Sequence, residues 1–444
     1  MSKLSRRRFI LTTGATAFTT AILHGCAQGG GDQANQTTTE TPPTENTAPQ
    51  TATTVTPEVT GAKLGFIALT DAAPLIIAKE KGLYAKYGMP DVEVLKQASW
   101  GTTRDNIVLG SASGGIDGAH ILSPIPYLIS MGTVTDGKPV PMYLLARLNV
   151  NGQGVILSNN YKDLKVGLDT APLKEAFGKV TDPKVAVTFP GGTHDCWMRY
   201  WLAAGGLEPG KDFSTIVVPP PQMVANMKVN TMESFCVGEP WPLQSVNQAI
   251  GYQALTTGQL WKDHPEKAFA MRKDWVDANP NATKALLMAI MEAQQWCDKA
   301  ENKEEMCQIL AKREWFKVPF EDIIDRSKGV FNFGNGSEPF EDTSLMQKYW
   351  ADNASYPYKS HDLWFLTENI RWGYLPASTD TKKIVDEVNR EDIWKEAAKA
   401  LGVPEAEIPT SPSRGIETFF DGVTFDPENP QAYLDSLKIK AIKA

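Results

Sequence analysis

The sequence lacks the short motifs that mark common nucleotide and metal sites. Its 444 residues contain no G-x-x-x-x-G-K-[ST] loop, no G-x-G-x-x-G after an expected strand and no H-E-x-x-H. Histidine is scarce, with five residues, and the five cysteines form no C-x-x-C pair. These absences argue against a P-loop ATPase, a dinucleotide-dependent enzyme and a zinc protein. We expect no metal and no cofactor.

Basic residues are outnumbered. The chain has 52 acidic and 44 basic side chains and a formal net charge of −8. Nucleic-acid-binding proteins select basic surfaces, so the balance predicts no nucleic-acid partner. The hydrophobic fraction of 42% is that of an ordinary globular protein, and the length suits two domains.

The N-terminus has the pattern of an export signal. Arg6, Arg7 and Arg8 precede a modestly apolar run from Phe9 to Leu23, which is too short to span a bilayer. The "SRRRFI" segment is typical of twin-arginine signals, and "LHGC", ending at Cys26, resembles a lipobox. We predict a signal peptide over 1–25 and lipidation of Cys26. The alternative is a plain secretory signal with an incidental cysteine.

Residues 26–60 are rich in Gly, Thr, Pro, Gln and Asn. Such a segment buries too little apolar surface to offset its ordering entropy. We expect a flexible linker between a lipid anchor and the folded body.

The folded part alternates strand and helix patterns. This order predicts an α/β fold with parallel strands. In the helix expected at 71–82, Asp71 is expected to be the N-cap and Gly82 to end the helix. The segments are strands at 62–69, 91–96, 114–121, 141–150, 153–158, 184–192, 213–221 and 232–242, and helices at 71–82, 99–110, 193–206 and 222–230.

After about residue 245 the sequence reads as mostly helical, most strongly at 280–300. Ligands of open α/β sheets lie beyond the carboxyl ends of the strands. The loops at 98–103, 151–154, 191–194 and 238–241 are therefore the candidate binding loops.

One of these loops, "FPGGTHDCW", places His194, Asp195 and Cys196 side by side. A Cys–His nucleophile is one interpretation, but successive helical residues point about 100° apart, which aims His194 and Cys196 poorly at each other. A hydrogen-bond donor at His194 and a packing role for Cys196 form the second interpretation. The spacing of Cys196, Cys236, Cys297 and Cys307 leaves their pairing open, with buried free thiols as the plain alternative.

Several long blocks carry a family resemblance. "KLGFIALTDAAPLIIAKEKGLYAKYGM", "SWGTTRDNIVLG", "ARLNVNGQG", "TFPGGTHDCWMRYWLAAGG" and "VGEPWP" resemble the nitrate/sulfonate/taurine class of ABC-transporter solute-binding proteins. Within it, the chain is similar to cyanobacterial nitrate-binding lipoproteins and their bicarbonate-binding siblings. The resemblance runs from about residue 60 to the end, and the signal and linker agree with it.

The resemblance implies a two-lobed class II periplasmic-binding fold, each lobe a mixed, mainly parallel sheet flanked by helices. It implies a first lobe from 61–150 and 245–444, the latter including a C-terminal helical extension, and a second lobe from 151–244. It also implies a monomer, not an enzyme, lipid-anchored on the periplasmic side of the inner membrane. Its partners would be an ABC permease with its ATPase subunits.

The resemblance also implies a site. In the nitrate branch the anion is held at positions that match Trp100, Gly101, Gln153, His194 and Lys267 here, so nitrate or nitrite is the expected ligand. In the bicarbonate branch, glutamine and glutamate replace the His and Lys, and calcium takes part. Bicarbonate stays the alternative ligand, and a purely structural surface lipoprotein the alternative role.

The residue types suit nitrate, which carries no proton and needs donors and positive charge. Lys267 supplies charge, His194 and Gln153 supply donors, and the helix expected to begin near residue 102 supplies backbone N–H groups. Such a site should present no carboxylate, so we expect Glu239 to pair with a basic residue or to cap the sheet. Each residue alone has a structural alternative: a packing tryptophan, a surface lysine, a solvated glutamine or a helix-cap histidine.

Overall fold

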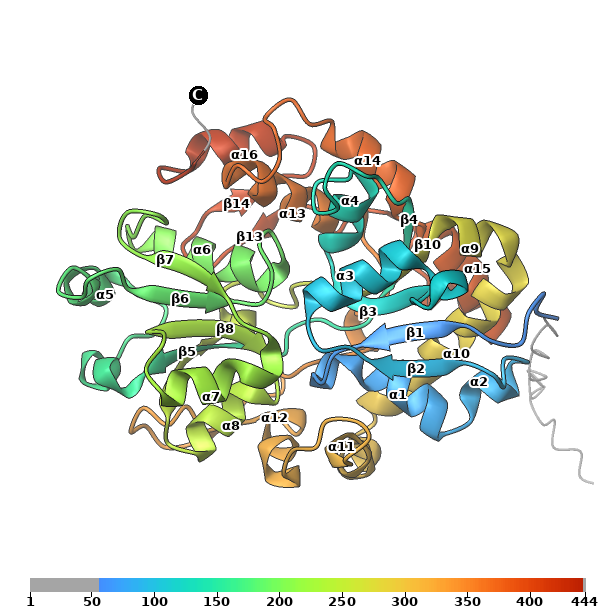
Figure 1. Cartoon of the computed structure of the whole chain (residues 1–444), viewed down its shortest axis with the longest axis horizontal. Helices are drawn as coiled ribbons and strands as arrows, with labels where there is room; N and C mark the ends of the chain where they lie inside the picture. The colour runs from blue at the N-terminus through green and yellow to red at the C-terminus, as the bar shows by residue number, and fades with distance from the viewer. Residues whose placement is uncertain (1–55, 442–444) are drawn as a thin grey trace, which may run out of the picture. The chain divides into compact units, whose positions relative to one another are not determined.

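Two five-stranded mixed sheets organise the chain. The computed structural model describes residues 56–441, so the predicted signal peptide, Cys26 and most of the predicted linker lie outside the described residues. Figure 1 shows the two sheets in separate halves, each flanked by helices. We call the part built on the first sheet the first lobe and the part built on the second sheet the second lobe. This confirms the predicted fold class.

The first sheet has the order β2-β1-β3-β10-β4, and only β10 runs against its neighbours. The second has the order β7-β6-β8-β5-β9, and β5 runs against β8 and β9. The strands are β1 (Lys63–Phe66), β2 (Glu93–Lys96), β3 (Gly118–Leu122), β4 (Met142–Arg147) and β10 (Lys267–Arg272) in the first sheet, and β5 (Gln153–Ser158), β6 (Lys184–Val187), β7 (Ser214–Val217), β8 (Ser234–Gly238) and β9 (Gly251–Thr256) in the second. Two short ribbons pair β11 (Val330–Phe331) with β12 (Phe340–Glu341) and β13 (Glu417–Thr418) with β14 (Thr424–Phe425).

Helices cover both sheets. The N-terminal part carries α1 (Ala73–Glu80), α2 (Leu83–Lys86), α3 (Trp100–Leu109) and α4 (Ile125–Ser130), and the second lobe carries α5 (Ala171–Phe177), α6 (Thr193–Ala204), α7 (Met223–Lys228) and α8 (Trp241–Asn247). The rest are α9 (Lys273–Ala278), α10 (Pro280–Asp298), α11 (Lys303–Ala311), α12 (Ile324–Ser327), α13 (Lys359–Arg371), α14 (Thr381–Val388), α15 (Glu391–Leu401) and α16 (Pro430–Ser436). Among residues 56–441, no helix is both long enough and apolar enough to cross a membrane.

Sequence patterns missed the two strands that complete the sheets. β9 and β10 lie in the region that we expected to be mostly helical, and almost all their residues are buried. Strands buried on both faces lose the alternation that identifies a strand. Their placement has two consequences: the second sheet continues past residue 244, and Lys267 opens a strand of the first sheet.

Two helix starts also differ from the prediction. Asp71 does not cap α1, whose N-cap is Ala72 without a side-chain hydrogen bond. Helix α3 begins at Trp100, within the predicted range of 99–110 but two residues before the start near residue 102 that was expected for the anion site, because the Ser99 hydroxyl accepts a hydrogen bond from the Thr102 N–H at 3.1 Å. This capping places Trp100 in the first turn, at the edge of the sheet where β1 and β3 end.

Residues at the end of the predicted linker contact the first lobe. The Glu58 carboxylate accepts hydrogen bonds from the backbone N–H groups of Asn281 and Ala282, at 3.0 and 2.8 Å. These N–H groups belong to the first turn of α10, where backbone N–H groups have no hydrogen-bond acceptor within the helix. Glu58, which lies within the predicted linker of 26–60, therefore contacts α10 of the first lobe.

The lobes are joined by hydrogen-bonded crossing segments. The chain leaves the first sheet after β4 and returns before β10. The two crossings pair where the Asn151 N–H donates to His264 O at 3.1 Å and the Glu266 N–H to Asn149 O at 3.3 Å. A third segment joins them, because Val150 and Lys348 exchange backbone hydrogen bonds.

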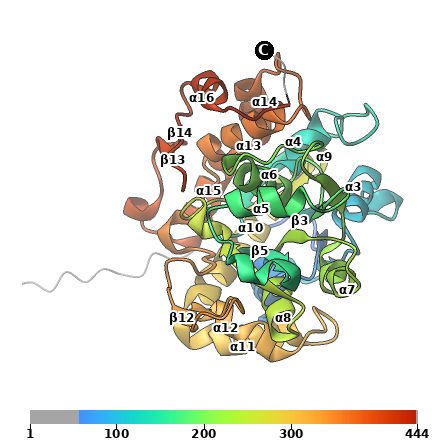
Figure 2. The same cartoon turned by 90° about the vertical axis from the view of Figure 1, so that its left-hand side faces the viewer.

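C-terminal helices bind both lobes. Helix α13 packs against α6 of the second lobe, and α14 packs against α4 and β4 of the first. Figure 2 shows α13, α14 and α16 at the same end of the molecule as in Figure 1. The predicted C-terminal helical extension therefore contacts more than the first lobe.

A buried glutamine fixes the first crossing to α10. The Gln294 Nε2 donates to the carbonyl oxygens of Arg147, Leu148 and Tyr349, and its Oε1 accepts from the Ser355 hydroxyl at 2.7 Å. Replacing Gln294 by leucine leaves these buried groups without their partner, and each such group costs about 1–3 kcal/mol.

We therefore expect Gln294→Leu to lower the free energy of unfolding by about 2–4 kcal/mol in chemical denaturation. The neighbouring Gln295, which is partly exposed, provides the matched control, since Gln295→Leu should change it by less than about 0.5 kcal/mol. Equal effects of the two substitutions would contradict this role of Gln294.

Buried histidines make the fold sensitive to acid. Burial lowers the pKa of His264 and that of His361 to about 3. In the unfolded chain a histidine titrates near 6.5, so the unfolded state binds more protons between these values. Stability is therefore full above pH 6.5 and falls as the pH decreases toward 3.

Each of these two histidines should remove about 1.4 kcal/mol per pH unit within that window. Denaturant titrations at pH 7.5 and 5.5 should show a loss of at least about 2 kcal/mol. A free energy of unfolding that is unchanged between the two pH values would show that these histidines are not buried in neutral form.

Candidate functional site

The edge where the parallel strands end gathers the candidate site residues. Trp100 begins α3 after β2, and Gln153 begins β5 opposite Gly238, the last residue of β8. Lys267 begins β10 opposite Leu122, the last residue of β3, because β10 is antiparallel to β3. Reversed strands thus bring their first residues to the edge where ligands of α/β sheets bind.

His194 reaches the same edge from the loop that joins β6 to α6. The strand β6 ends at Val187, and Gly191 and Gly192 lead into α6. Gly191 has φ +69°, and a Cβ on Gly192 would lie 2.7 Å from Leu122 Cδ1. The Gly-Gly pair is therefore needed for this loop to approach the first lobe and place His194 there.

Hydrogen bonds connect these side chains directly. The His194 Nε2–H donates to Gln153 Oε1 at 2.7 Å, and Thr188 Oγ1 lies 2.5 Å from its Nδ1. The Gln153 Nε2 donates to Asp71 Oδ2 at 3.2 Å, and the same oxygen lies 2.9 Å from Lys267 Nζ. Three predicted residues thus share one network across the two lobes, joined by Asp71.

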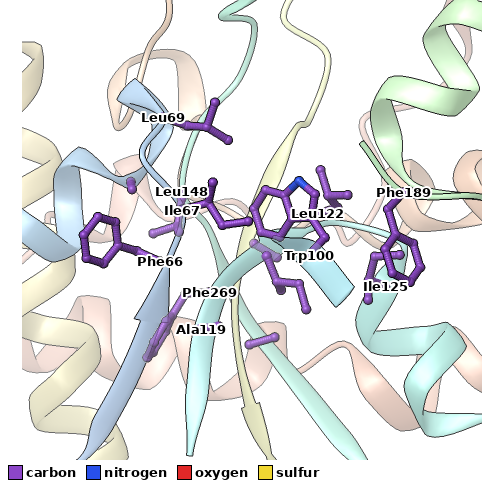
Figure 3. Packing of buried hydrophobic residues seen from close by; sticks show 14 of the residues in the cluster. Phe66, Ile67, Leu69, Trp100, Ala119, Leu122, Ile125, Leu148, Phe189 and Phe269 are labelled. Carbon is purple, nitrogen blue, oxygen red and sulfur yellow. The ribbon is translucent and has the colours of Figure 1, made fainter. Parts of the chain in front are cut away.

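Trp100 lies against this network. The Lys267 ammonium lies 5.8 Å from the centre of its ring, and the His120 ring lies 5.3 Å away. Figure 3 shows the Trp100 ring among the buried apolar side chains of the cluster. Trp100 is 1% exposed, and within residues 56–441 its indole N–H has no hydrogen-bond partner. A buried donor left unpaired costs about 1–3 kcal/mol, so this N–H marks a position for a ligand acceptor.

Gly101 has a different place. It lies partly exposed in the first turn of α3, and the nearest atom to a Cβ there would be Ser99 Oγ at 3.6 Å. Gly101 lies near the site only because it follows Trp100 in the first turn of α3. The backbone N–H of Gly101 belongs to the positive end of the helix dipole.

Two carboxylates in the cluster were missed by the sequence analysis. Asp71 contacts Lys267 and accepts a hydrogen bond from His120 Nε2 at 2.5 Å. Glu266 Oε1 lies 2.8 Å from Lys267 Nζ and accepts from the Thr193 hydroxyl, and its Oε2 accepts from Trp197 Nε1 at 2.7 Å. The prediction was that no carboxylate faces the ligand, and it left out these two acids, which compensate the charge of the buried ammonium.

Signals for both acids were present in the sequence. Glu266 directly precedes Lys267, and Asp71 follows the first strand at its carboxyl end, where ligand-binding residues collect. The helix-cap interpretation of Asp71 competed with this one. His120, in the middle of β3, gave no comparable signal.

Charges in the cluster set the protonation of its members. Burial alone would raise the pKa of Asp71, but Lys267 and His120 outweigh it and hold that pKa well below its usual range. Burial raises the pKa of Glu266 despite Lys267. Burial alone would lower the pKa of Lys267, but the two acids raise it above its ordinary value. Lys267 is therefore charged and paired first with Asp71.

Burial keeps the histidine at the centre of the site neutral. It lowers the pKa of His194 well below its ordinary value, and the charge of Lys267 adds to the effect. With Gln153 Oε1 as its acceptor, Nε2 carries the proton and Nδ1 accepts from Thr188. His194 can therefore donate one hydrogen bond into the site.

The neighbours of His194 have structural roles. Asp195 accepts from the Gly191 N–H at 2.9 Å and from Arg199 Nε at 2.6 Å. Cys196 is buried, and burial raises the pKa of its thiol well above the usual value. A Cys–His nucleophile needs a thiolate beside the imidazole, so this arrangement opposes it.

The remaining sequence expectations also have outcomes. Glu239 pairs with a basic residue as predicted, since its Oε1 lies 3.3 Å from Arg326 Nε. The cysteines at 196, 236, 297 and 307 are free and buried. In the part of the chain that the structure describes, no group of three or more His, Cys, Asp or Glu side chains is arranged to hold a metal ion.

Comparison with known proteins gives a consistent set of relatives. Residues 55–311 match the model of the NMT1-like family. The chain is 79% identical to the nitrate/nitrite binding protein NrtA of Synechocystis, over 100% of this chain and 99% of that protein. It is 45% identical to the bicarbonate-binding protein CmpA of Synechococcus elongatus, over 98% of each chain.

A solved structure agrees. The crystal structure of the periplasmic nitrate-binding protein NrtA from Synechocystis superposes with a TM-score of 0.86, at 86% identity, over 86% of this chain and 100% of that one. The chain therefore belongs to the NMT1-like family, in the group that contains the cyanobacterial nitrate/nitrite binding proteins.

Proposed function

We propose that this protein is the solute-binding component of an ABC importer for nitrate and nitrite. The observation that carries the proposal is the fully buried ammonium of Lys267 beside the unpaired indole N–H of Trp100. Relatives named as nitrate-binding proteins, at up to 79% identity over full length, support it.

The ligand would be held by Trp100, Gly101, Gln153, His194 and Lys267. Lys267 supplies positive charge, and His194 Nε2 and the Gln153 amide supply directed hydrogen bonds. The first turn of α3 supplies backbone N–H groups near Gly101. Nitrate is planar and carries no proton, so a set made of donors suits it, whereas bicarbonate also needs an acceptor for its O–H.

The two acids would position Lys267 and balance its positive charge. A bound anion has to share the ammonium with Asp71, which holds it by an ion pair at 2.9 Å. Since burial raises the pKa of Glu266, protonation of this group offers a way to offset the added negative charge. Asp71 and Glu266 therefore act on the anion through Lys267.

The residues of this site come from both lobes, so the site fits a mechanism in which the two lobes close on the anion. We place the second lobe at about 151–256, so that β9 is included, and the first lobe at about 61–150 with the chain after 256. The crossing segments then form the hinge, a motion typical of periplasmic binding proteins. Residues 1–25 are proposed as the signal peptide and 26–55 as the flexible linker.

The same proposal assigns a place and partners. We infer a monomer, lipid-anchored through Cys26 on the periplasmic side of the inner membrane, that passes the anion to an ABC permease with its ATPase subunits. Cys196, as a buried thiol with a raised pKa, supports a binding role without catalysis. No cofactor is needed for such a role.

Reversing the charge of Lys267 tests the ligand. At about 4 Å and an effective dielectric constant of about 20, two like charges repel by about 4 kcal/mol, which is about a thousandfold in affinity. We expect Lys267→Glu to abolish the nitrate signal in calorimetry, whereas Lys262→Glu, an equal change at an exposed position, should keep wild-type affinity. A folded Lys267→Glu protein that binds nitrate within about threefold of wild type would remove Lys267 from the site.

Replacing Cys26 tests the anchor. Serine cannot take a thioether-linked lipid, and several acyl chains are needed for stable membrane attachment. After cell lysis and high-speed centrifugation, Cys26→Ser should move from the membrane fraction to the supernatant, while Cys196→Ser should remain with the membranes. A Cys26→Ser protein that sediments entirely with membranes would place the anchor elsewhere.

A further inference from the structure

A cavity lies between the lobes beside Gln153, which is one of its lining residues. Its walls also include Thr70, Glu239, Lys303, Arg326 and Tyr349. The space that water-sized particles can occupy measures about 20 Å³, and one water needs about 10–15 Å³ on the same scale. The cavity therefore holds one particle of about the size of water.

Lys303 brings an incompletely paired ammonium to this cavity. It is 3% exposed, and among the described residues its nearest carboxylate oxygen is Asp298 Oδ1, at 3.7 Å. Asp298 is already bound by the backbone N–H groups of Tyr349, Trp350 and Ala351. The ammonium also lies over the Tyr349 ring, at 5.4 Å from its centre. A buried charge needs closer hydrogen-bond partners than these.

Arg326 brings a second cation, which contacts residues of the second lobe. Its guanidinium donates to Gln253 Oε1 of β9 and to two backbone carbonyls, and its Nε lies 3.3 Å from Glu239 Oε1. Burial still lowers the pKa of Arg326, despite the charge of Glu239, and burial raises the pKa of Glu239. Glu239 is therefore the carboxylate that pairs with this guanidinium, at 3.3 Å.

Gln347 adds an unpaired donor. Its side chain lines the cavity and is 93% buried, and its Oε1 accepts from the Thr70 hydroxyl at 2.7 Å. Within residues 56–441 its Nε2 has no partner. The donors without close partners at this cavity are thus an ammonium and an amide NH₂, which need an acceptor between them.

We propose that this cavity binds one monatomic anion, of the chloride or bromide type, between Lys303 and Arg326. A space of this size suits a monatomic ion better than an oxyanion of four or more atoms, and two cations with an unpaired amide favour an anion over water. The cavity borders the cluster at Lys267 through Gln153, but its proposed cations are different residues and it does not depend on the identity of the ligand at Lys267.

Bromide identifies the site directly. Crystals of the full-length protein soaked in sodium bromide should show an anomalous peak within hydrogen-bond distance of Lys303 Nζ and Gln347 Nε2. The peak should persist in Lys299→Met, which removes an exposed charge four residues away, and should disappear in Lys303→Met. Ordered water without bromide in the wild-type cavity, or a peak that survives Lys303→Met, would overturn the proposal.

A solution measurement covers the case in which Lys303→Met does not fold. At constant ionic strength, replacing gluconate by chloride should raise the thermal midpoint of the wild-type and Lys299→Met proteins. The rise should be smaller in Gln347→Leu, which keeps both cations and loses the amide donor. All these variants keep Lys267, so halide binding there would raise the thermal midpoint of each by the same amount. An equal total rise in Gln347→Leu and the wild type would therefore contradict a site at this cavity.

Discussion

Burying one ammonium between two lobes is the constraint on which the rest of the site depends. Lys267 is fully buried, and its compensation comes from Asp71 and Glu266. Those acids are in turn held by side chains of the other lobe: Gln153 bonds to Asp71, while Thr193 and Trp197 bond to Glu266. Separating the lobes would remove these partners, so the charge balance at Lys267 and the closed arrangement are properties of the same network.

The same network makes anion binding an exchange of partners. His194 and Gln153, the two proposed side-chain donors, already bond to each other, and Lys267 is already paired. The free energy of anion binding is therefore the difference between the interactions that form and those that are replaced. The indole N–H of Trp100 has no partner among the described residues, so its hydrogen bond to the anion replaces none. Selectivity then depends on how well an anion matches donors that are held in place by the protein.

Sequence reasoning succeeded where local chemistry decides the structure. Strand β5 begins and ends at the predicted residues, and the Gly-Gly turn before α6 was correctly seen as leading His194 to the sheet edge. The family resemblance supplied Trp100 and Lys267, which composition alone would leave as a packing and a surface residue. What failed depends on tertiary structure: two fully buried strands lack a pattern, and Asp71 has the sequence of a helix cap but serves as the partner of a distant lysine.

The three crossing segments restrict how the molecule can deform. Backbone hydrogen bonds join Asn151 to His264 and Val150 to Lys348, so the three segments form one narrow hydrogen-bonded ribbon instead of three independent linkers. Bending such a ribbon across its flat face preserves these bonds, whereas twisting it about its length strains them. In the proposed closure the two lobes therefore move mainly along this one bending direction, so their outer surfaces would reach a single relative orientation in the closed state.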